Sequence, residues 1–274
     1  MTSVSIKTIL FFILIVFSSA LFAQIEKVNY GTGSWNADSL GNHRAVVAVK
    51  SEGNAVRVVI PWRRRDFEPE KKKIIAADSV SGKIINNVKV VSVSREAGEL
   101  IFEPVSGAGN YFVYYFPYKS EGKSNYPKGI YLEPVNNASP EWLNKIANEI
   151  IPDAVCRRIE AVDEFNSFYP MEVIATKKET DEIIKQAGAK PFILFPEDRE
   201  YPIKMDSDLP LRWIERGTVN EFKGSASRGE NYTYQIGIFA LKDLKDVKVD
   251  FSPLKSKSGS SIPVINITRV ALTL

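Results

Sequence analysis

Short runs of β-branched and aromatic residues, separated by turn-forming sequences, fill residues 44–133. Turn signals such as Ser51-Glu52-Gly53-Asn54 recur roughly every ten residues, a spacing typical of a β-sandwich or barrel. In residues 83–94 the side chains alternate between two faces for part of the length, as expected of a strand with one face buried. The pattern predicts an all-β first domain over residues 24–136. Its predicted strands are 44–50, 55–60, 83–94, 100–103 and 110–117.

Two helices are predicted in the following part of the chain, residues 137–216. Ser139 and Pro140 form a helix start, with a capping hydroxyl followed by proline at the first helical position. The second helix is predicted to begin after Thr176, because Glu179 can complete a capping box, and to end at Gly188. Helices mixed with strand-like pieces predict a small α+β connector. Its predicted strands are 155–162, 171–175 and 191–195.

The last part of the chain, residues 217–274, returns to a strand-like pattern. Residues 231–240 alternate at period two, and residues 247–251 are predicted to be their pairing partner. Because two or three strands are too few for an independent sandwich, the sequence predicts the start of a second, truncated β-sandwich here. The expected fold is therefore mainly β: an antiparallel sandwich, a two-helix connector and an incomplete second sandwich.

The first residues predict export from the cell. Residues 9–17 form an unbroken apolar run within a predicted signal peptide over residues 1–23. The run is shorter than the ~18 apolar residues that span a bilayer, although an uncleaved membrane anchor is the alternative interpretation. With Cys156 as the only cysteine, no intrachain disulfide can form, which favours the periplasm or surface of a Gram-negative bacterium. We expect no membrane association after signal cleavage.

Charge and residue counts exclude several classes of function. A formal net charge of +3 gives no reason to expect a nucleic-acid partner. His43 is the only histidine, and in a turn before the first strand it is expected to be a solvated side chain rather than a catalytic base. Glu197 and Asp198 are the densest carboxylate pair, although a charged turn explains them more simply than a catalytic dyad. The sequence predicts no metal, no cofactor and no catalytic residue.

One charged segment is a candidate carbohydrate site. Trp62 is followed by three consecutive arginines, Arg63, Arg64 and Arg65, and then by Asp66. An exposed indole can stack on a sugar ring while a guanidinium donates paired hydrogen bonds. The alternative is a solvated hairpin arm whose opposite charges offset each other. The predicted carbohydrate-binding residues are Trp62, Arg63, Arg64 and Tyr126.

Several stretches, taken in order, resemble the N-terminal region of exported bacterial proteins related to glycoside hydrolase family 123. The similarity runs through most of residues 30–250, and it depends on the order of the motifs rather than on any single one. The motifs are VIPWRRRD at 59–66, FEP at 102–104, GNYFVYY at 109–115, NYPK at 125–128, FPEDR at 195–199, LPLRW at 209–213 and GENYTYQIG at 229–237.

The resemblance implies β-sandwich modules followed by a (β/α)8 barrel that carries the chemistry. Family members hydrolyse terminal N-acetyl-β-galactosaminide linkages, and an Asp-Glu pair in the barrel assists the acetamido group of the substrate. No catalytic residue can be carried over, because residues 1–274 contain no such barrel pattern. The leading hypothesis is a non-catalytic accessory region of a secreted glycoside hydrolase. The alternatives are a stand-alone glycan-binding or adhesion protein and a small hydrolase that uses Glu197 or Asp198.

Overall fold

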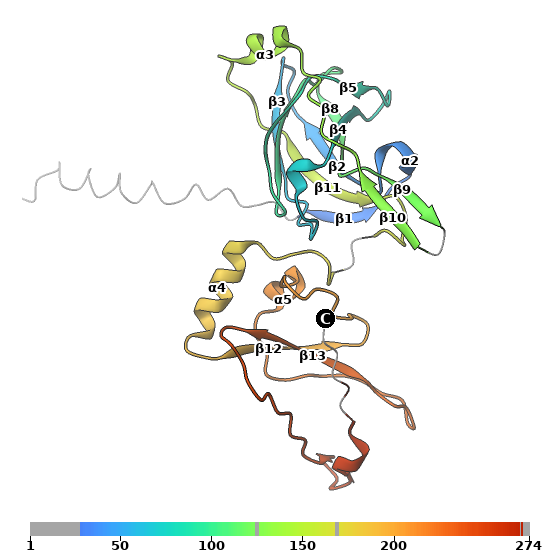
Figure 1. Ribbon diagram of the computed structural model, residues 1–274, viewed down its shortest axis with the longest axis vertical. Helices are drawn as coiled ribbons and strands as arrows, with labels where there is room; N and C mark the ends of the chain where they lie inside the picture. The colour runs from blue at the N-terminus through green and yellow to red at the C-terminus, as the bar shows by residue number, and fades with distance from the viewer. Residues whose placement is uncertain (1–27, 124–125, 168–169, 269, 271–274) are drawn as a thin grey trace, which may run out of the picture.

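The computed structural model describes residues 28–123, 126–167, 170–268 and 270, so the predicted signal peptide over residues 1–23 lies outside the described residues. Figure 1 shows a larger β-rich part and, below it, a smaller part with helices α4 and α5. In the described part of the chain, each helix is too short or too polar to cross a membrane. The fold is mainly β, as the sequence predicts.

The larger part is a sandwich of two sheets. All neighbouring strands run antiparallel except β1 and β11, which are parallel. The six-stranded sheet has the order β1 (Asn29–Thr32), β11 (Val155–Ala161), β2 (His43–Val49), β8 (Gly109–Tyr115), β4 (Ile74–Asp78) and β5 (Ile84–Ile85). The three-stranded sheet has the order β3 (Val56–Ile60), β7 (Gly98–Phe102) and β6 (Val88–Val93).

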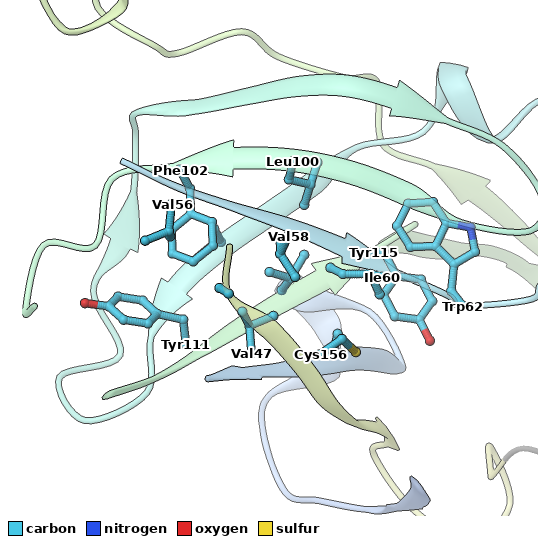
Figure 2. Close-up of a cluster of buried hydrophobic side chains, with 14 of the residues drawn as sticks. Val47, Val56, Val58, Ile60, Trp62, Leu100, Phe102, Tyr111, Tyr115 and Cys156 are labelled. Atoms are coloured by element: carbon cyan, nitrogen blue, oxygen red, sulfur yellow. The ribbon is translucent and has the colours of Figure 1, made fainter. Parts of the chain in front are cut away.

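The core lies between these two sheets and consists of the inward-facing side chains of their strands. In β3, Val56, Val58 and Ile60 are buried while Arg57 and Val59 are exposed, the alternation expected of a strand with one face in a core. Figure 2 shows these side chains meeting Val47 and Tyr111 from the opposite sheet. Burial of this aliphatic and aromatic cluster is the main stabilising contribution to the sandwich.

The sandwich extends past the predicted boundary at residue 136. Strand β11 was predicted to lie in the connector. It lies instead between β1 and β2 in the six-stranded sheet. Helix α3 (Pro140–Ile146) also belongs to the sandwich, because Trp142 packs on Ala55 and its indole N–H donates to the carbonyl of Asn54 at 2.8 Å. The Ser139 hydroxyl caps this helix as predicted, accepting from the Trp142 N–H at 3.1 Å.

Several sandwich elements were not predicted from sequence. Most of them are short or polar, so their sequences show only weak periodic patterns. Two of them are the strands β1 and β4. The others are α2 (Ala37–Leu40), η2 (Pro69–Lys71), β9 (Tyr118–Lys123) and β10 (Tyr126–Tyr131), of which the last two form a hairpin.

The smaller part packs two helices on one face of a two-stranded sheet. Helix α4 (Lys177–Ala187) begins with the predicted capping box of Thr176 and Glu179 and is followed by Gly188 at a φ of +63°. Strand β12 (Phe192–Asp198) pairs antiparallel with β13 (Tyr234–Ala240). Helix α5 (Leu211–Arg216), not predicted from sequence, places Trp213 on Phe195 with ring centroids 4.4 Å apart.

Two strand predictions in this region are wrong. Residues 247–251 form no strand, and β13 pairs instead with β12 from the predicted connector. Residues 171–175 contribute only an isolated bridge between Ile174 and Pro210. The predicted limit at residue 216 therefore falls between the two strands of one sheet. The remaining described elements are β14 (Leu254–Lys255), β15 (Ser261–Ile262) and η3 (Val264–Asn266).

Candidate functional site

Trp62 lies just after β3 and is fully buried between the sheets (Figure 2). Its ring packs against Tyr115 and Phe116 at centroid distances of 5.2 and 4.9 Å, and its indole N–H donates to the carbonyl of Ser94 at 2.8 Å. Gly98 of β7 makes room for the ring, since a Cβ there would lie 2.0 Å from the indole. Trp62 is therefore not the exposed platform expected from the sequence, and neither face of its indole is free to stack on a sugar.

Arg64 and Asp66 form a partly buried ion pair. The Arg64 Nε donates to Asp66 Oδ2 at 2.7 Å, and Asp66 also accepts from the Tyr131 hydroxyl and lies 3.5 Å from the Lys72 ammonium. Burial opposes ionisation of Asp66, but Arg64, Tyr131 and Lys72 outweigh it and hold the pKa of this carboxyl well below its ordinary value. Arg64 is therefore engaged within the protein rather than presented to solvent.

His43 completes this partly buried group and differs from the solvated turn residue that the sequence suggested. It opens strand β2, where its ring nitrogens lie 2.8 and 3.1 Å from Arg64 Nη1 and its Nε2 lies 3.0 Å from the carbonyl of Asn166. Burial, together with the adjacent Arg64 charge, lowers the pKa of His43 to about 3. The imidazole is therefore neutral at pH 7 and works as a structural contact.

Arg63 points away from the sandwich core and joins the two parts of the molecule. Its guanidinium binds the Glu179 carboxylate through two bonds, of 2.7 and 2.9 Å. Its carbonyl accepts from the Ile174 N–H at 3.1 Å. Arg63 adopts a left-handed conformation with φ of 48°, which is uncommon for a residue with a side chain. The bidentate ion pair and the backbone bond hold it in this conformation.

Further ion pairs surround this contact and define a junction between the sandwich and the smaller part. Arg95 binds Asp208 through bonds of 3.0 and 2.5 Å, and Arg65 lies 3.2 Å from Glu172. The junction thus places basic side chains of the sandwich against acidic side chains of the smaller part. One contact has the opposite polarity, since Glu96 accepts from the Lys177 N–H at the start of α4 at 2.7 Å. We call these residues the arginine junction; they are Arg63, Arg65, Arg95, Glu96, Glu172, Glu179 and Asp208.

Tyr126, the fourth predicted carbohydrate-binding residue, begins β10 and pairs with Lys123 of β9. Its side chain lies outside the described part of the structure. Of the four candidates, the structure brings Trp62, Arg63 and Arg64 together along one segment, but engages each of them internally. Carbohydrate binding by this segment stays a prediction.

The carboxylate pair Glu197 and Asp198 does not form a dyad in this structure. Adjacent residues of a strand point to opposite faces, so the fully buried Glu197 points into the core while Asp198 accepts from the Tyr232 hydroxyl on the other side. Glu197 accepts from the Trp213 indole at 3.0 Å and from Arg212 and Arg216, each at 3.2 Å. Glu197 therefore holds α5 against the sheet.

A second cluster, on the outer face of the six-stranded sheet, was not predicted from the sequence. The Arg44 guanidinium lies between the rings of Trp35 and Phe112, 4.4 and 3.7 Å from their centroids, and pairs with Glu160 at 2.7 Å. The alternation of Arg44 with Ala45 was the available signal, but two of the partners, Phe112 and Glu160, come from strands that are distant in the sequence. No group of three or more potential metal ligands occurs among the described residues.

Residues 33–162 match the family model described as glycoside hydrolase 123, N-terminal domain. This part of the chain, 130 of the 274 residues, is similar to that domain. The matched region ends one residue after β11, so it includes the strand and helix that extend the sandwich beyond residue 136. No curated protein and no solved structure matches the chain.

Proposed function

We propose that this chain is a non-catalytic accessory region of an exported glycoside hydrolase, active in the periplasm or at the surface of a Gram-negative bacterium. The observation that carries the proposal is the family match over residues 33–162. In this proposal the parent enzyme acts on a glycan with a terminal N-acetylgalactosaminide-type linkage. The chemistry is performed by a (β/α)8 barrel outside the described residues.

The geometry of the arginine junction favours an accessory, non-catalytic role. Arg63 and Arg95 each make two bonds to a carboxylate, and paired geometry fixes direction as well as distance. The backbone bond from Ile174 to Arg63 adds a further constraint between the sandwich and the smaller part. Such a junction presents both parts to a neighbouring domain in one relative orientation.

The carboxylates best placed for independent chemistry are already engaged. Glu197 is held by three donor side chains, and Asp66 by a guanidinium, a phenol and an ammonium. A general acid in glycoside hydrolysis must reach the leaving-group oxygen in a cleft. Both side chains are instead enclosed by their partners, which supports the non-catalytic part of the proposal.

The first test is hydrolysis of a panel of nitrophenyl glycosides that includes the N-acetyl-β-galactosaminide. We expect the purified chain to give no turnover above the buffer rate. Turnover that persists through purification and is lost in the Glu197→Gln/Asp198→Asn double variant, with its fold intact by circular dichroism, would overturn the proposal in favour of a small hydrolase.

The second test is genomic and biochemical. We expect a neighbouring reading frame that encodes a (β/α)8 barrel, and a raised rate of hydrolysis when the barrel and this chain are produced together. Should no such frame exist and a glycan array give strong binding to the chain alone, the stand-alone glycan-binding alternative would replace the accessory role.

A further inference from the structure

A cleft of about 470 Å³ opens along one side of the sandwich, between the edge of each sheet. One wall is the inner face of β6, with Val88, Val90 and Val93. The other wall comes from β4 and β5, with Ile74, Ile84 and Ile85. None of the described residues that line the cleft is aromatic, so the valine and isoleucine side chains suit branched aliphatic groups rather than the stacking of sugar rings. Glu70, Lys72 and Lys73 also line the cleft and add charged groups to it.

Val90 shows that the core is incomplete at this point. Its cross-strand partner in β7 is Leu100, which is fully buried in the core. Val90 nevertheless remains 48% exposed. A side chain on the inner face of a sandwich normally packs against the opposite sheet. Here the opposite sheet ends at the two-residue strand β5, and the slot beside it is unfilled.

The unpaired edge of β6 indicates which kind of ligand the slot can bind. β6 pairs with β7 along one edge, and no described residue pairs with its other edge. β6 runs for six residues, a length of about 20 Å, and has a β-bulge between Val90 and Ser92. An unpaired edge presents alternating N–H and C=O groups that another strand can satisfy. An aliphatic chain would fill the slot but leave the N–H and C=O groups of β6 bonded to water. A polypeptide strand would fill the slot with its side chains and pair these groups with its backbone.

Two described segments lie near this edge: η2 contacts β6, and residues 133–138 cover the cleft, but neither makes a backbone bond to β6. Residues 133–138 cross the outer side of the cleft, with Pro134 and Val135 on its lining. The crossing is anchored beside its two ends, where the Lys73 N–H donates to the Leu132 carbonyl and the Ser139 N–H donates to Asn87 Oδ1. Between these anchors residues 133–137 are exposed and make no backbone bond to β6 among the described residues.

We propose that the cleft binds an extended strand of a partner protein with aliphatic residues at alternate positions. The strand adds to the free edge of β6 and inserts every second side chain between the two sheets. Main-chain hydrogen bonds supply the affinity and the aliphatic slot supplies the selectivity, as in other cases of β-strand addition. The interface is separate from the arginine junction, and no residue of that junction lines it.

The test uses a fluorescent eight-residue peptide with valine at every second position, threonine between, and a glutamate at each end for solubility. We expect saturable binding to the whole chain by fluorescence anisotropy. Val90→Glu should weaken binding by about tenfold or more, because it places a carboxylate in an aliphatic slot. Val91→Glu is the matched control: this residue is 45% exposed on the same strand but does not line the cleft, and we expect less than a twofold change.

Two further probes separate strand addition from simple filling. Only every second amide of an added strand faces β6, so two peptides are compared, one N-methylated at the odd positions and one at the even positions. Both keep the side chains, and we expect the peptide whose β6-facing donors are methylated to lose binding. Dodecanoate supplies an aliphatic chain without a backbone, and we expect it to compete weakly. Undiminished binding of both N-methylated peptides, effective displacement by dodecanoate, or no binding of the parent peptide would each overturn the proposal. Val90→Glu and Val91→Glu must have matching melting temperatures, and slowed hydrogen exchange at β6 amides in the complex provides an independent readout.

Discussion

At the scale of single residues, the environment of Trp62 depends on a glycine far away in the sequence. An indole next to three arginines suggested a surface platform, but Gly98 leaves a space that the ring occupies. The space arises only when β3 and β7 pair, with Ile60 opposite Gly98. A local sequence pattern therefore cannot distinguish a buried tryptophan of this kind from an exposed one.

Gly98→Ala should destabilise the sandwich by about 1–3 kcal/mol, because the new Cβ would lie 2.0 Å from a buried ring that has no room to move. Urea unfolding monitored by tryptophan fluorescence would measure the loss. Gly53→Ala is the control, since its Cβ would meet no atom closer than 3.6 Å and it should change the free energy of unfolding little. A Gly98→Ala variant as stable as the control would show that the indole is not confined.

His43 predicts how stability depends on pH. Its folded pKa of about 3 is below the ordinary value of 6.5, so the unfolded chain takes up the proton first. Stability from this group is complete above pH 6.5 and falls as the pH drops towards 3, by about 2 kcal/mol at pH 5. Denaturation at pH 5–7.5 should show this slope in the wild type and lose it in His43→Gln. Because the chain has no other histidine, a slope that persists in His43→Gln would contradict the assignment.

At the scale of helices and strands, the sequence correctly predicted those features that depend only on neighbouring residues. The caps at Ser139 and Thr176 depend on residues three positions away, and both helices begin as predicted. Strand pairing depends on distant partners, and so the assignments of β11 and β13 to their sheets were wrong. Alternation in β13 was readable, but its buried face was not: Ile236 and Ile238 are exposed. The candidate site was predicted as a segment, whereas its partners came from elements that sequence could not place beside it.

The capping box of α4 is open to a direct test. Thr176→Ala removes the oxygen that accepts from the Glu179 N–H at 3.2 Å, and we expect a loss of about 1 kcal/mol in the free energy of unfolding. Gln186→Ala, an exposed position in the same helix, should be neutral or slightly stabilising because alanine favours helix. Equal stabilities for the two variants would mean that the cap contributes nothing beyond helix propensity.

At the scale of the whole molecule, the arginine segment connects the fold to the proposed role. Arg64 is directed into the sandwich while Arg63 and Arg65 are directed to the smaller part. One short segment thus fixes the base of the core and the orientation of its neighbour. A family-matched sandwich held in this way can position a catalytic domain without contacting substrate, which is the function we propose.

The arginine junction should determine whether the two parts unfold together. The triple variant Glu172→Gln, Glu179→Gln, Asp208→Asn removes the acidic side of the junction, while glutamine at 179 still allows the capping box. Since partly exposed pairs contribute on the order of 1 kcal/mol each, we expect one calorimetric transition to separate into two. High salt should weaken the wild-type coupling in the same direction, because the pairs are only partly buried.

The control for this experiment removes the same charge elsewhere. Glu52→Gln, Glu121→Gln and Glu182→Gln together change three exposed carboxylates that make no ion pair with described residues. This control should retain the wild-type transition, since net charge alone does not hold the parts together. If the junction variant also melts in one transition at the temperature of the control, the orientation depends on the backbone bond between Arg63 and Ile174 and on apolar contacts. The arginines would then be surface charges that accompany the junction without stabilising it.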